Sequence, residues 1–416
     1  MPDQPLHYYC GEAALDELTR YCRQNQLDRF ILISDTNTHP VLGQRTTVAL
    51  QSQGWQVREI ILEGPEVVAD ESYLQYVLDR SESKPWVFLS VGSGTLTDIA
   101  RYCSYQKNTT FICLPSAPSV DGFASVVAPI VVKGFKDTVP AQAPQAIFAD
   151  LPTLCAAPKA MIAAGMGDML GKYTSLADWK LDHILWGEPY DSQIAARLER
   201  ALLACVENVE GVRQADPQGI ANLLGGLVES GICMIQAGNS RPASGAEHHL
   251  SHFWEMKLLR QSRPAVLHGA KVGVGTVLTA GRWEQVRALS LQDVEQRLSR
   301  SRLPSLEQER QAIEAAFHPN TEPIYQNQTR FLELSEANYT VLKEKIHQNW
   351  GEIKEIAARV PMATRMIELF EQVGGPTQVS GIGLDAQDEA EALRYAHYLR
   401  NQFTVAKLGR ILGLWE

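Results

Sequence analysis

The sequence predicts an α/β fold in which a Rossmann-like domain with a parallel sheet precedes an all-helical domain. Short apolar runs of strand length recur at 29–35, 85–94 and 109–116, and helical segments separate them. Strands and helices that alternate in this way form a parallel sheet with helices on its faces. Beyond Pro158 the apolar residues recur at the helical period. The length of 416 residues also favours two domains over one.

We expect the first domain to span residues 1–157. The run "RFILISD" ends in a turn at Asp35, and "WQVREIIL" follows a helical stretch. "PWVFLSVGSG" ends in a glycine turn, and "TTFICLPS" ends in small and hydroxyl residues. The segment "LTDIARYCSYQ" between these two runs has a helical pattern.

We expect the second domain to span residues 158–416. Two apolar stripes at helical spacing support it, and we interpret them as core. The stripes comprise Ile194, Leu198, Leu202, Cys205 and Val209, and then Ile220, Leu223, Leu224, Leu227 and Val228. The polar, proline-containing stretch 302–327 is expected to connect helices.

Composition excludes several classes of function. The formal net charge is −10, which is atypical of a protein with a broad nucleic-acid-binding surface. An anionic substrate would therefore need a local positive charge. No apolar run approaches the length of a membrane span, and the N-terminus "MPDQPLHYYC" lacks a signal-peptide pattern. The seven cysteines are scattered, which favours reduced thiols in the cytoplasm.

Loops at the ends of the expected strands suit a nucleotide. "VGSGTLTDIA" places a Gly-x-Gly turn at the start of a helix, where backbone amides favour an anion, although a plain tight turn is an equal alternative. Asp35 is either a turn residue or an acceptor for ribose hydroxyls, where it would also repel a 2′-phosphate and favour NAD. In "LPSAPSVDGFASVVAP", Asp121 is either a turn residue or a carboxylate in the cleft.

Three histidines lie close together in "SGAEHHLSHFWE". His248 and His252 are four residues apart and would share one helix face, where they are either metal or substrate ligands or merely solvated side chains. Asp168 lies beside glycine in a helical segment, where its low helix propensity favours a site role. His268 is either a core residue or faces His248 across a helical hairpin. Together, Asp168, His248 and His268 match the ligand pattern of a catalytic metal.

The order of these motifs is similar to that of a known family. It reads GSGT-L-x-D, S-x-D-G-x-x-S, G-D, S-G-x-E-H-x-x-S-H and H-G-x-x-V. This order resembles the iron-type alcohol dehydrogenase-like polyol dehydrogenases of the glycerol dehydrogenase and dehydroquinate synthase superfamily. Within that superfamily it most resembles the sn-glycerol-1-phosphate dehydrogenase family. The resemblance covers nearly the whole chain, and "RPASGAEHHLSH" and "APSVDGFAS" are its most specific stretches.

The resemblance implies one divalent metal ion, zinc, nickel or iron, held by Asp168, His248 and His268. It implies NAD as cofactor, with NADP as the alternative. Asp121 and His252 would carry catalysis and bind the substrate, which Asp168 would also contact, and His249 has no assigned role. The residues that would contact the cofactor, besides Asp35, are Gly94, Thr95, Leu96, Thr97, Asp98, Ser116, Ala117, Pro118, Ser119 and Ser125.

The implied reaction is the reversible reduction of dihydroxyacetone phosphate to sn-glycerol 1-phosphate, a step of phospholipid biosynthesis, by a cytoplasmic homodimer without a nucleic-acid or membrane partner. Arg241 and Lys172 are candidate phosphate anchors by sequence proximity alone. The alternatives are a glycerol dehydrogenase, a dehydroquinate synthase-like cyclase and an inactive nucleotide-binding module. "HGAKV" departs from the H-G-E-K of glycerol dehydrogenases, and Asp168 with "EHHLSH" departs from the Glu and G-H-x-x-G-H of dehydroquinate synthases.

Overall fold

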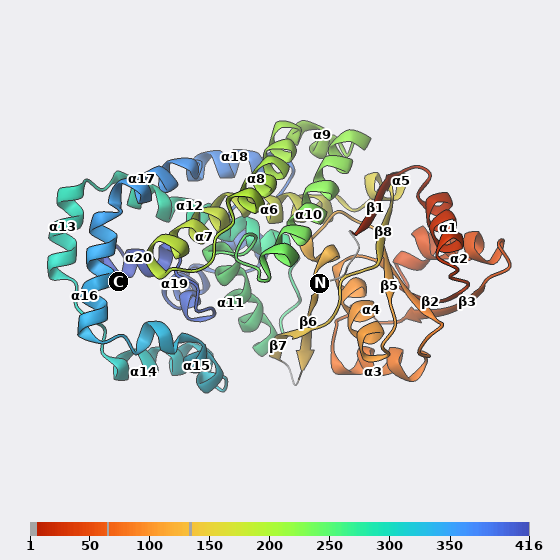
Figure 1. Ribbon diagram of the computed structural model, residues 1–416, viewed down its shortest axis with the longest axis horizontal. Helices are drawn as coiled ribbons and strands as arrows, with labels where there is room; N and C mark the ends of the chain where they lie inside the picture. Colours follow the sequence, from red (N-terminus) through yellow and green to blue (C-terminus); the bar gives the residue numbers. More distant parts are fainter. Residues whose placement is uncertain (1–5, 65, 133–134, 416) are drawn as a thin grey trace. The chain divides into compact units, whose positions relative to one another are not determined.

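The computed structural model describes residues 6–64, 66–132 and 135–415 (Figure 1). Its described N-terminal part contains a six-stranded parallel sheet in the order β1-β8-β5-β4-β2-β3. The predicted apolar runs form strands of this sheet, which confirms the α/β prediction, whereas β1, β8 and the separate antiparallel pair β6–β7 were not predicted. The strands are β1 (His7–Gly11), β2 (Arg29–Asp35), β3 (Gln56–Leu62), β4 (Val87–Gly92), β5 (Phe111–Pro115), β6 (Val127–Val132), β7 (Phe135–Pro140) and β8 (Ala146–Asp150).

Helices fill the connections between these strands. They are α1 (Ala14–Gln24), the π-helix η1 (His39–Gly43), α2 (Gln44–Gln51), α3 (Glu71–Asp79), α4 (Gly94–Gln106), the 3-10 helix η2 (Asp121–Ala124) and α5 (Leu151–Cys155). Helix α3 begins where it does because the Asp70 carboxylate accepts hydrogen bonds from the backbone amides of Ser72 and Tyr73.

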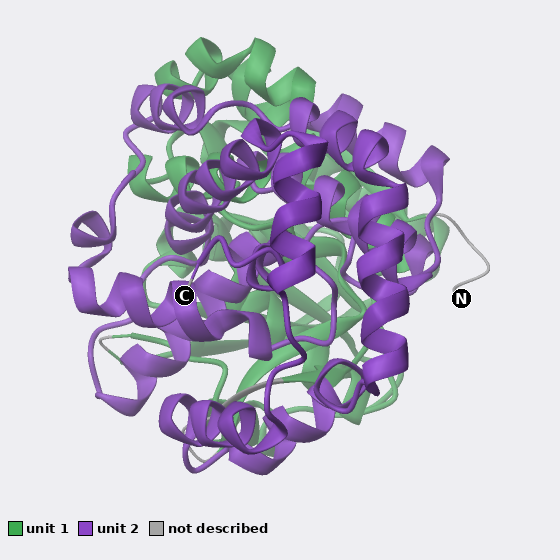
Figure 2. Cartoon of the chain, turned by 90° about the vertical axis from the view of Figure 1, so that its left-hand side faces the viewer, with its two compact units in different colours: residues 1–169, 203–235 green, residues 170–202, 236–416 purple. Residues whose placement is uncertain are grey.

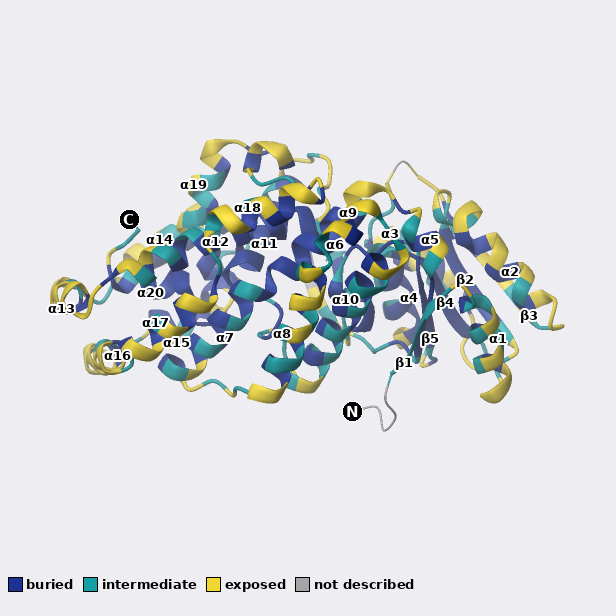
Figure 3. Cartoon of the chain, turned by 90° about the horizontal axis from the view of Figure 1, so that it is seen from above, coloured by how far each residue is buried: buried dark blue, intermediate teal, exposed yellow. Residues whose placement is uncertain are grey.

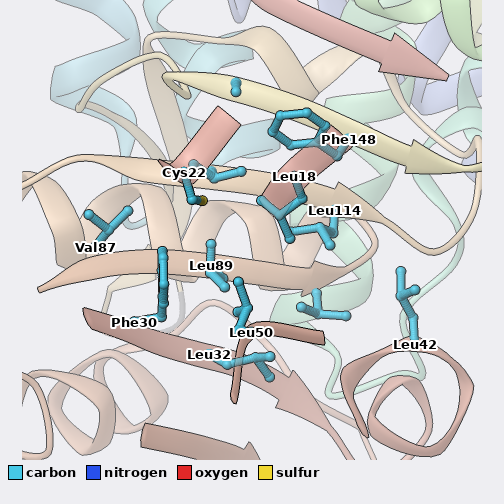
Figure 4. Packing of buried hydrophobic residues seen from close by; sticks show 13 residues of the cluster. Leu18, Cys22, Phe30, Leu32, Leu42, Leu50, Val87, Leu89, Leu114 and Phe148 are labelled. Carbon is cyan, nitrogen blue, oxygen red and sulfur yellow. The ribbon is translucent and has the colours of Figure 1, made fainter. Parts of the chain in front are cut away.

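Both faces of the parallel sheet are buried, and alternate side chains of each strand pack against opposite faces. Leu18 of α1 and Leu50 of α2 pack in one core with Phe30 and Leu32 of β2 (Figure 4). The intervening residues of the strands face the other side, because side chains alternate along a strand. Helix α4 lies on that side, where its Thr97 hydroxyl lies 3.5 Å from the Cys113 sulfur of β5. Burial on both faces explains the continuous apolar runs of these strands.

The strand order places the loops that follow β2 and β4 next to each other, at the carboxyl ends of the strands. Strand β2 lies between β3 and β4, so the chain moves to one side of β2 and then to the other. In open α/β sheets, ligands bind beyond the carboxyl ends of strands at such a switch point. Asp35 ends β2 and Gly92 ends β4, so the position of both loops follows from the topology.

The rest of the chain is helical in its described residues, which confirms the second part of the fold prediction. Its α-helices are α6 (Lys159–Leu170), α7 (Lys172–Trp186), α8 (Ser192–Glu207), α9 (Val209–Gln214), α10 (Pro217–Ala237), α11 (Ala246–Arg260), α12 (His268–Ala288), α13 (Leu291–Arg300), α14 (Leu306–Phe317), α15 (Thr321–Leu332), α16 (Glu336–Gln348), α17 (Trp350–Arg359), α18 (Ala363–Gln372), α19 (Ala386–Tyr395) and α20 (Val405–Ile411). The 3-10 helices are η3 (Val379–Ile382) and η4 (Ala396–Tyr398).

The prediction that 302–327 merely connects helices is wrong. Helix α14 and most of α15 occupy this stretch. Each helix buries only a few apolar residues, such as Ile313 and Phe317 in α14 and Ile324 in α15. Two short helices with narrow buried faces look polar in the sequence, and Pro319 separates them.

The chain divides into two compact units (Figure 2). The first comprises Met1–Met169 and Leu203–Ile235, and the second comprises Leu170–Leu202 and Gln236–Glu416. The α/β unit thus includes nearly all of α6, all of α9 and most of α10. The predicted domain boundary at Ala157 lies just after the last strand of the sheet, whereas these two units are each built from two separate stretches of chain. The predicted boundary stays a prediction.

One helix among the described residues, α10, is long and apolar enough to cross a membrane by length and composition alone. The expectation that no segment reaches this length was therefore too strong. Half of the apolar window of α10 is buried, including Leu223 and Leu227, as in the core helix of a folded domain (Figure 3). The criterion is weak evidence for a membrane span.

Candidate metal and cofactor site

The three histidine rings of the helical unit lie together. His248 and His252 are one turn apart on α11, and their ring centroids are 6.2 Å apart. His268 begins α12, and its ring lies 5.3 Å from that of His248 and 5.8 Å from that of His252. Helix α11 packs against α12, so the hairpin that the sequence suggested brings all three side chains to one place.

The start of α11 is held by a buried acidic residue of α7. The Asp178 carboxylate accepts hydrogen bonds from the backbone amides of Ala246 in α11 and Val405 in α20, at 2.8 and 2.7 Å. Burial, together with the nearby Glu247, raises the pKa of Asp178 well above its ordinary value. Asp178 therefore fixes the first turn of α11, the turn that carries His248.

Asp168 and Asp121 lie together in the α/β unit. Asp168, on α6, is fully buried, and its Oδ2 accepts a hydrogen bond from the Asp121 backbone amide at 2.9 Å. The Asp121 carboxylate is also buried, and its Oδ2 accepts a hydrogen bond from the Ser230 hydroxyl of α10 at 2.8 Å. Ser230 is a residue of this site that sequence reasoning missed, because it lies on a helix interpreted only as core.

The two residue groups contain a set of potential metal ligands. Asp168 of the α/β unit offers one carboxylate oxygen, and His248 and His268 of the helical unit each offer one imidazole nitrogen. Two imidazole nitrogens and one carboxylate oxygen, none on an exposed residue, form a donor set that suits zinc, nickel or iron. The residues present therefore fit a divalent metal ion.

His252 belongs to a second charged group. Its Nδ1 lies 3.5 Å from Glu255 Oε2, and Lys271 Nζ lies 3.2 Å from Glu255 Oε1. Burial lowers the pKa of His252 to about 4, although Glu255 opposes this shift, so His252 is neutral at pH 7. Glu255 and Lys271 were missed by sequence reasoning. The signals were their spacings, three residues after His252 and three after His268.

The glycine turn after β4 opens directly into α4. Gly94 is the first residue of the helix, and Gly94 and Thr95 are partly exposed, whereas Leu96 and Thr97 are buried. The Thr97 hydroxyl donates to the Ser93 carbonyl at 3.0 Å. The hydroxyl is thus turned back onto the helix, and the assignment of Thr97 to the cofactor stays a prediction.

The Asp98 carboxylate forms a salt bridge with Arg101, which is completely buried. The Arg101 guanidinium also donates to the carbonyl oxygens of Gly122 and Phe123. Asp98 therefore supports the η2 turn that carries Asp121, a structural role that the cofactor interpretation did not include.

The loop after β5 packs closely against α6. Its residues Ala117, Pro118 and Ser119 are buried, and Ser116 is partly buried. A Cβ on Gly165 of α6 would lie 1.8 Å from the Pro118 carbonyl oxygen, so a glycine is required at this contact. Ser125, at the end of η2, instead pairs its hydroxyl with the backbone of Val127, at 3.0 Å to the nitrogen and 3.0 Å to the oxygen.

Asp35 closes a local turn at the carboxyl end of β2. Its Oδ1 accepts hydrogen bonds from the backbone amides of Asn37 and Thr38, and from the Thr38 hydroxyl. This is the turn role that the sequence left open. The partly exposed side chain also lies at the strand end where a ribose would bind in such a sheet.

The two suggested phosphate anchors already have structural partners. Arg241 is paired with Asp182 at 2.9 Å and with Glu188 at 3.3 Å. Lys172 is completely buried and donates to the Ala243 carbonyl at 3.1 Å. Because two carboxylates compensate the Arg241 charge, Arg241 is a poor anchor for an anionic substrate.

Comparison with known proteins identifies the family. A family model described as iron-containing alcohol dehydrogenase matches residues 9–158. A glycerol-1-phosphate dehydrogenase, NAD(P)+, from Geobacillus thermodenitrificans is 36% identical over 94% of this chain and 89% of its own. The protein of the same name from Bacillus subtilis is 36% identical over 95% of this chain and 88% of its own.

Solved structures show the same fold. A probable glycerol dehydrogenase from Sinorhizobium meliloti has a TM-score of 0.60 and 15% identity, and the match covers 99% of this chain and 96% of that one. A maleylacetate reductase from Agrobacterium tumefaciens has a TM-score of 0.57 and 12% identity, over 94% of this chain and 89% of that one. The structure matches show the fold alone, whereas the sequence matches at 36% identity cover nearly the whole chain and show the family. The chain belongs to the glycerol-1-phosphate dehydrogenase family.

Proposed function

We propose that the protein catalyses the reversible reduction of dihydroxyacetone phosphate to sn-glycerol 1-phosphate, with NADH or NADPH and one divalent metal ion. The observation that carries the proposal is the ligand set Asp168, His248 and His268 in a member of this family. A protein that had lost catalysis would have no need to keep all three ligand residues. The proposed ion is zinc, nickel or iron.

When bound, the cofactor would supply a hydride, and a metal ion held by Asp168, His248 and His268 would act as a Lewis acid on the substrate carbonyl. The loops proposed to hold the cofactor follow strands β2, β4 and β5. We assign Gly94 and Thr95 to the pyrophosphate, the loop 116–119 to the nicotinamide side and Asp35 to the adenosine ribose. Helix α4 begins at Gly94, and the backbone amides of a first helical turn favour a negative charge such as that of the pyrophosphate.

His252 and Asp121 are the proposed substrate residues. A neutral His252 with Nδ1–H directed at Glu255 has a lone pair on Nε2, which can accept a hydrogen bond from a substrate hydroxyl. The Asp121 carboxylate is oriented by the Ser230 hydroxyl and can accept a second hydrogen bond from the substrate. Two fixed acceptors would hold the substrate in one orientation and expose one face of its carbonyl group to the hydride.

We also propose that the enzyme works in the cytoplasm as a homodimer. All seven cysteines lie within the described residues and are free thiols, which suits a reducing compartment.

The test is turnover of dihydroxyacetone phosphate by purified protein that has been stripped of metal and then reloaded. We expect NADH oxidation only after reloading, and sn-glycerol 1-phosphate as the product in a stereospecific assay. The His252→Ala variant should bind metal like the wild type but lose catalytic efficiency. Turnover that persists in the stripped protein, or formation of the opposite enantiomer, would overturn the proposal.

A further inference from the structure

Glu247 is a completely buried carboxylate in the first turn of α11. Its Oε1 accepts hydrogen bonds from the Gly245 backbone amide at 2.6 Å and from His248 Nδ1 at 2.8 Å. Its Oε2 accepts a hydrogen bond from the Thr174 hydroxyl of α7 at 2.6 Å. All of these residues belong to the helical unit (Figure 2).

The contact with His248 determines which ring nitrogen carries the proton. The Gly245 amide can only donate, so Oε1 of Glu247 is an acceptor, and Nδ1 of His248 must be the donor in its contact with Oε1. A neutral imidazole then has its lone pair on Nε2, and this is the nitrogen that can bind a metal ion.

Closing the first turn of α11 does not by itself require Glu247. Asp178 already accepts the Ala246 amide at this turn. A Cβ on Gly245 would lie 2.7 Å from Asp178 Oδ2 and 3.0 Å from Glu247 Oε2, so both buried carboxylates lie beside the same face of this glycine.

We propose that Glu247 is a positioning residue for the metal ion: it holds His248 as the Nδ1–H tautomer, so that Nε2 is the ligand atom. The inference rests on the proposed metal site. A carboxylate on the far nitrogen of a ligating histidine fixes the orientation of the ring and makes the ligand nitrogen more basic. Glu247 would therefore act on metal affinity, and on activity only through the metal.

The decisive measurement is the dissociation constant for Zn²⁺ of metal-stripped, full-length protein, obtained by competition with a chromophoric chelator. Glu247→Gln should bind Zn²⁺ about 10- to 100-fold more weakly than the wild type. Thr174→Val is the matched control, because it removes a donor to Glu247 but leaves the contact with His248. We expect it to bind Zn²⁺ within about threefold of the wild type. Equal affinity of Glu247→Gln and wild type overturns the inference.

A second measurement needs no variant and covers the case in which Glu247→Gln does not fold. Two-bond proton–nitrogen correlation spectra of the stripped wild-type protein report the tautomer of each histidine. We expect His248 to carry its proton on Nδ1, and a proton on Nε2 overturns the inference. Wild-type protein that binds no Zn²⁺ at all refutes the proposed function itself, a result distinct from tight binding that is unaffected by Glu247→Gln.

Discussion

Replacing Gly165 with alanine should damage the cofactor site without replacing any proposed ligand residue. The new Cβ would lie 1.8 Å from the Pro118 carbonyl oxygen, and Cβ atoms essentially never approach closer than 3.0 Å. Either α6 or the loop 116–119 must therefore move by about 1.2 Å, the difference between these two distances. A shift of about 1 Å at a catalytic site costs on the order of 100-fold in rate. Overpacking should also destabilise the fold by about 1–3 kcal/mol.

The assay is kcat/KM for NADH together with the free energy of unfolding in urea. Gly225→Ala is the matched control, because Gly225 lies inside α10 and its Cβ would have no neighbour within 4 Å. It should keep wild-type kinetics and gain about 0.5–1 kcal/mol of stability from the better helix propensity of alanine. Wild-type kinetics in Gly165→Ala would refute the close packing of the loop on α6.

Three further predictions test individual side chains. His248→Ala should lose metal and activity together, because two remaining ligands hold an ion poorly; full metal occupancy by elemental analysis would contradict the ligand assignment. Asp35→Gly should narrow the difference in kcat/KM between NADH and NADPH, since its carboxylate would repel a 2′-phosphate; an unchanged ratio would remove Asp35 from the cofactor site. Burial, and then Arg410 and Lys407, hold the pKa of His397 well below its ordinary value. The unfolded chain therefore binds a proton that the folded chain does not, and stability falls below about pH 6.5 by up to about 1.4 kcal/mol per pH unit. His397→Gln should remove this contribution to the pH dependence of the free energy of unfolding, measured by urea unfolding at several pH values. An unchanged pH dependence would contradict the assignment to His397.

The sequence predicted those parts of the fold in which local pattern and tertiary environment agree. Strand β2 coincides with the run that ends at Asp35, because a strand buried on both faces is apolar throughout. The five-residue strands β1 and β8 were missed because they are too short to show a period. Helices α14 and α15 were missed because their buried faces are narrow.

The candidate site was predictable where its residues are close in sequence or belong to a motif. His248 and His252 share a helix face because of their spacing, and the structure places His268 beside them. The structural role of Asp98 was harder to predict from the sequence. Its partner Arg101 is three residues away, but the carbonyl groups that Arg101 binds lie on another segment. The contact of Ser230 with Asp121 exists because α10 belongs to the α/β unit although it lies far along the chain, and no local sequence pattern predicts this.

The central claim is that the substrate carries a phosphate group. The most direct test compares dihydroxyacetone phosphate with dihydroxyacetone, with NADH and at a fixed metal concentration. A phosphate that gains even one charge-assisted hydrogen bond, about 1.5–3 kcal/mol, should be preferred by about 10- to 100-fold in kcat/KM. We predict a preference of at least this size for the phosphate ester. Equal or better turnover of dihydroxyacetone would contradict the account and favour a glycerol dehydrogenase.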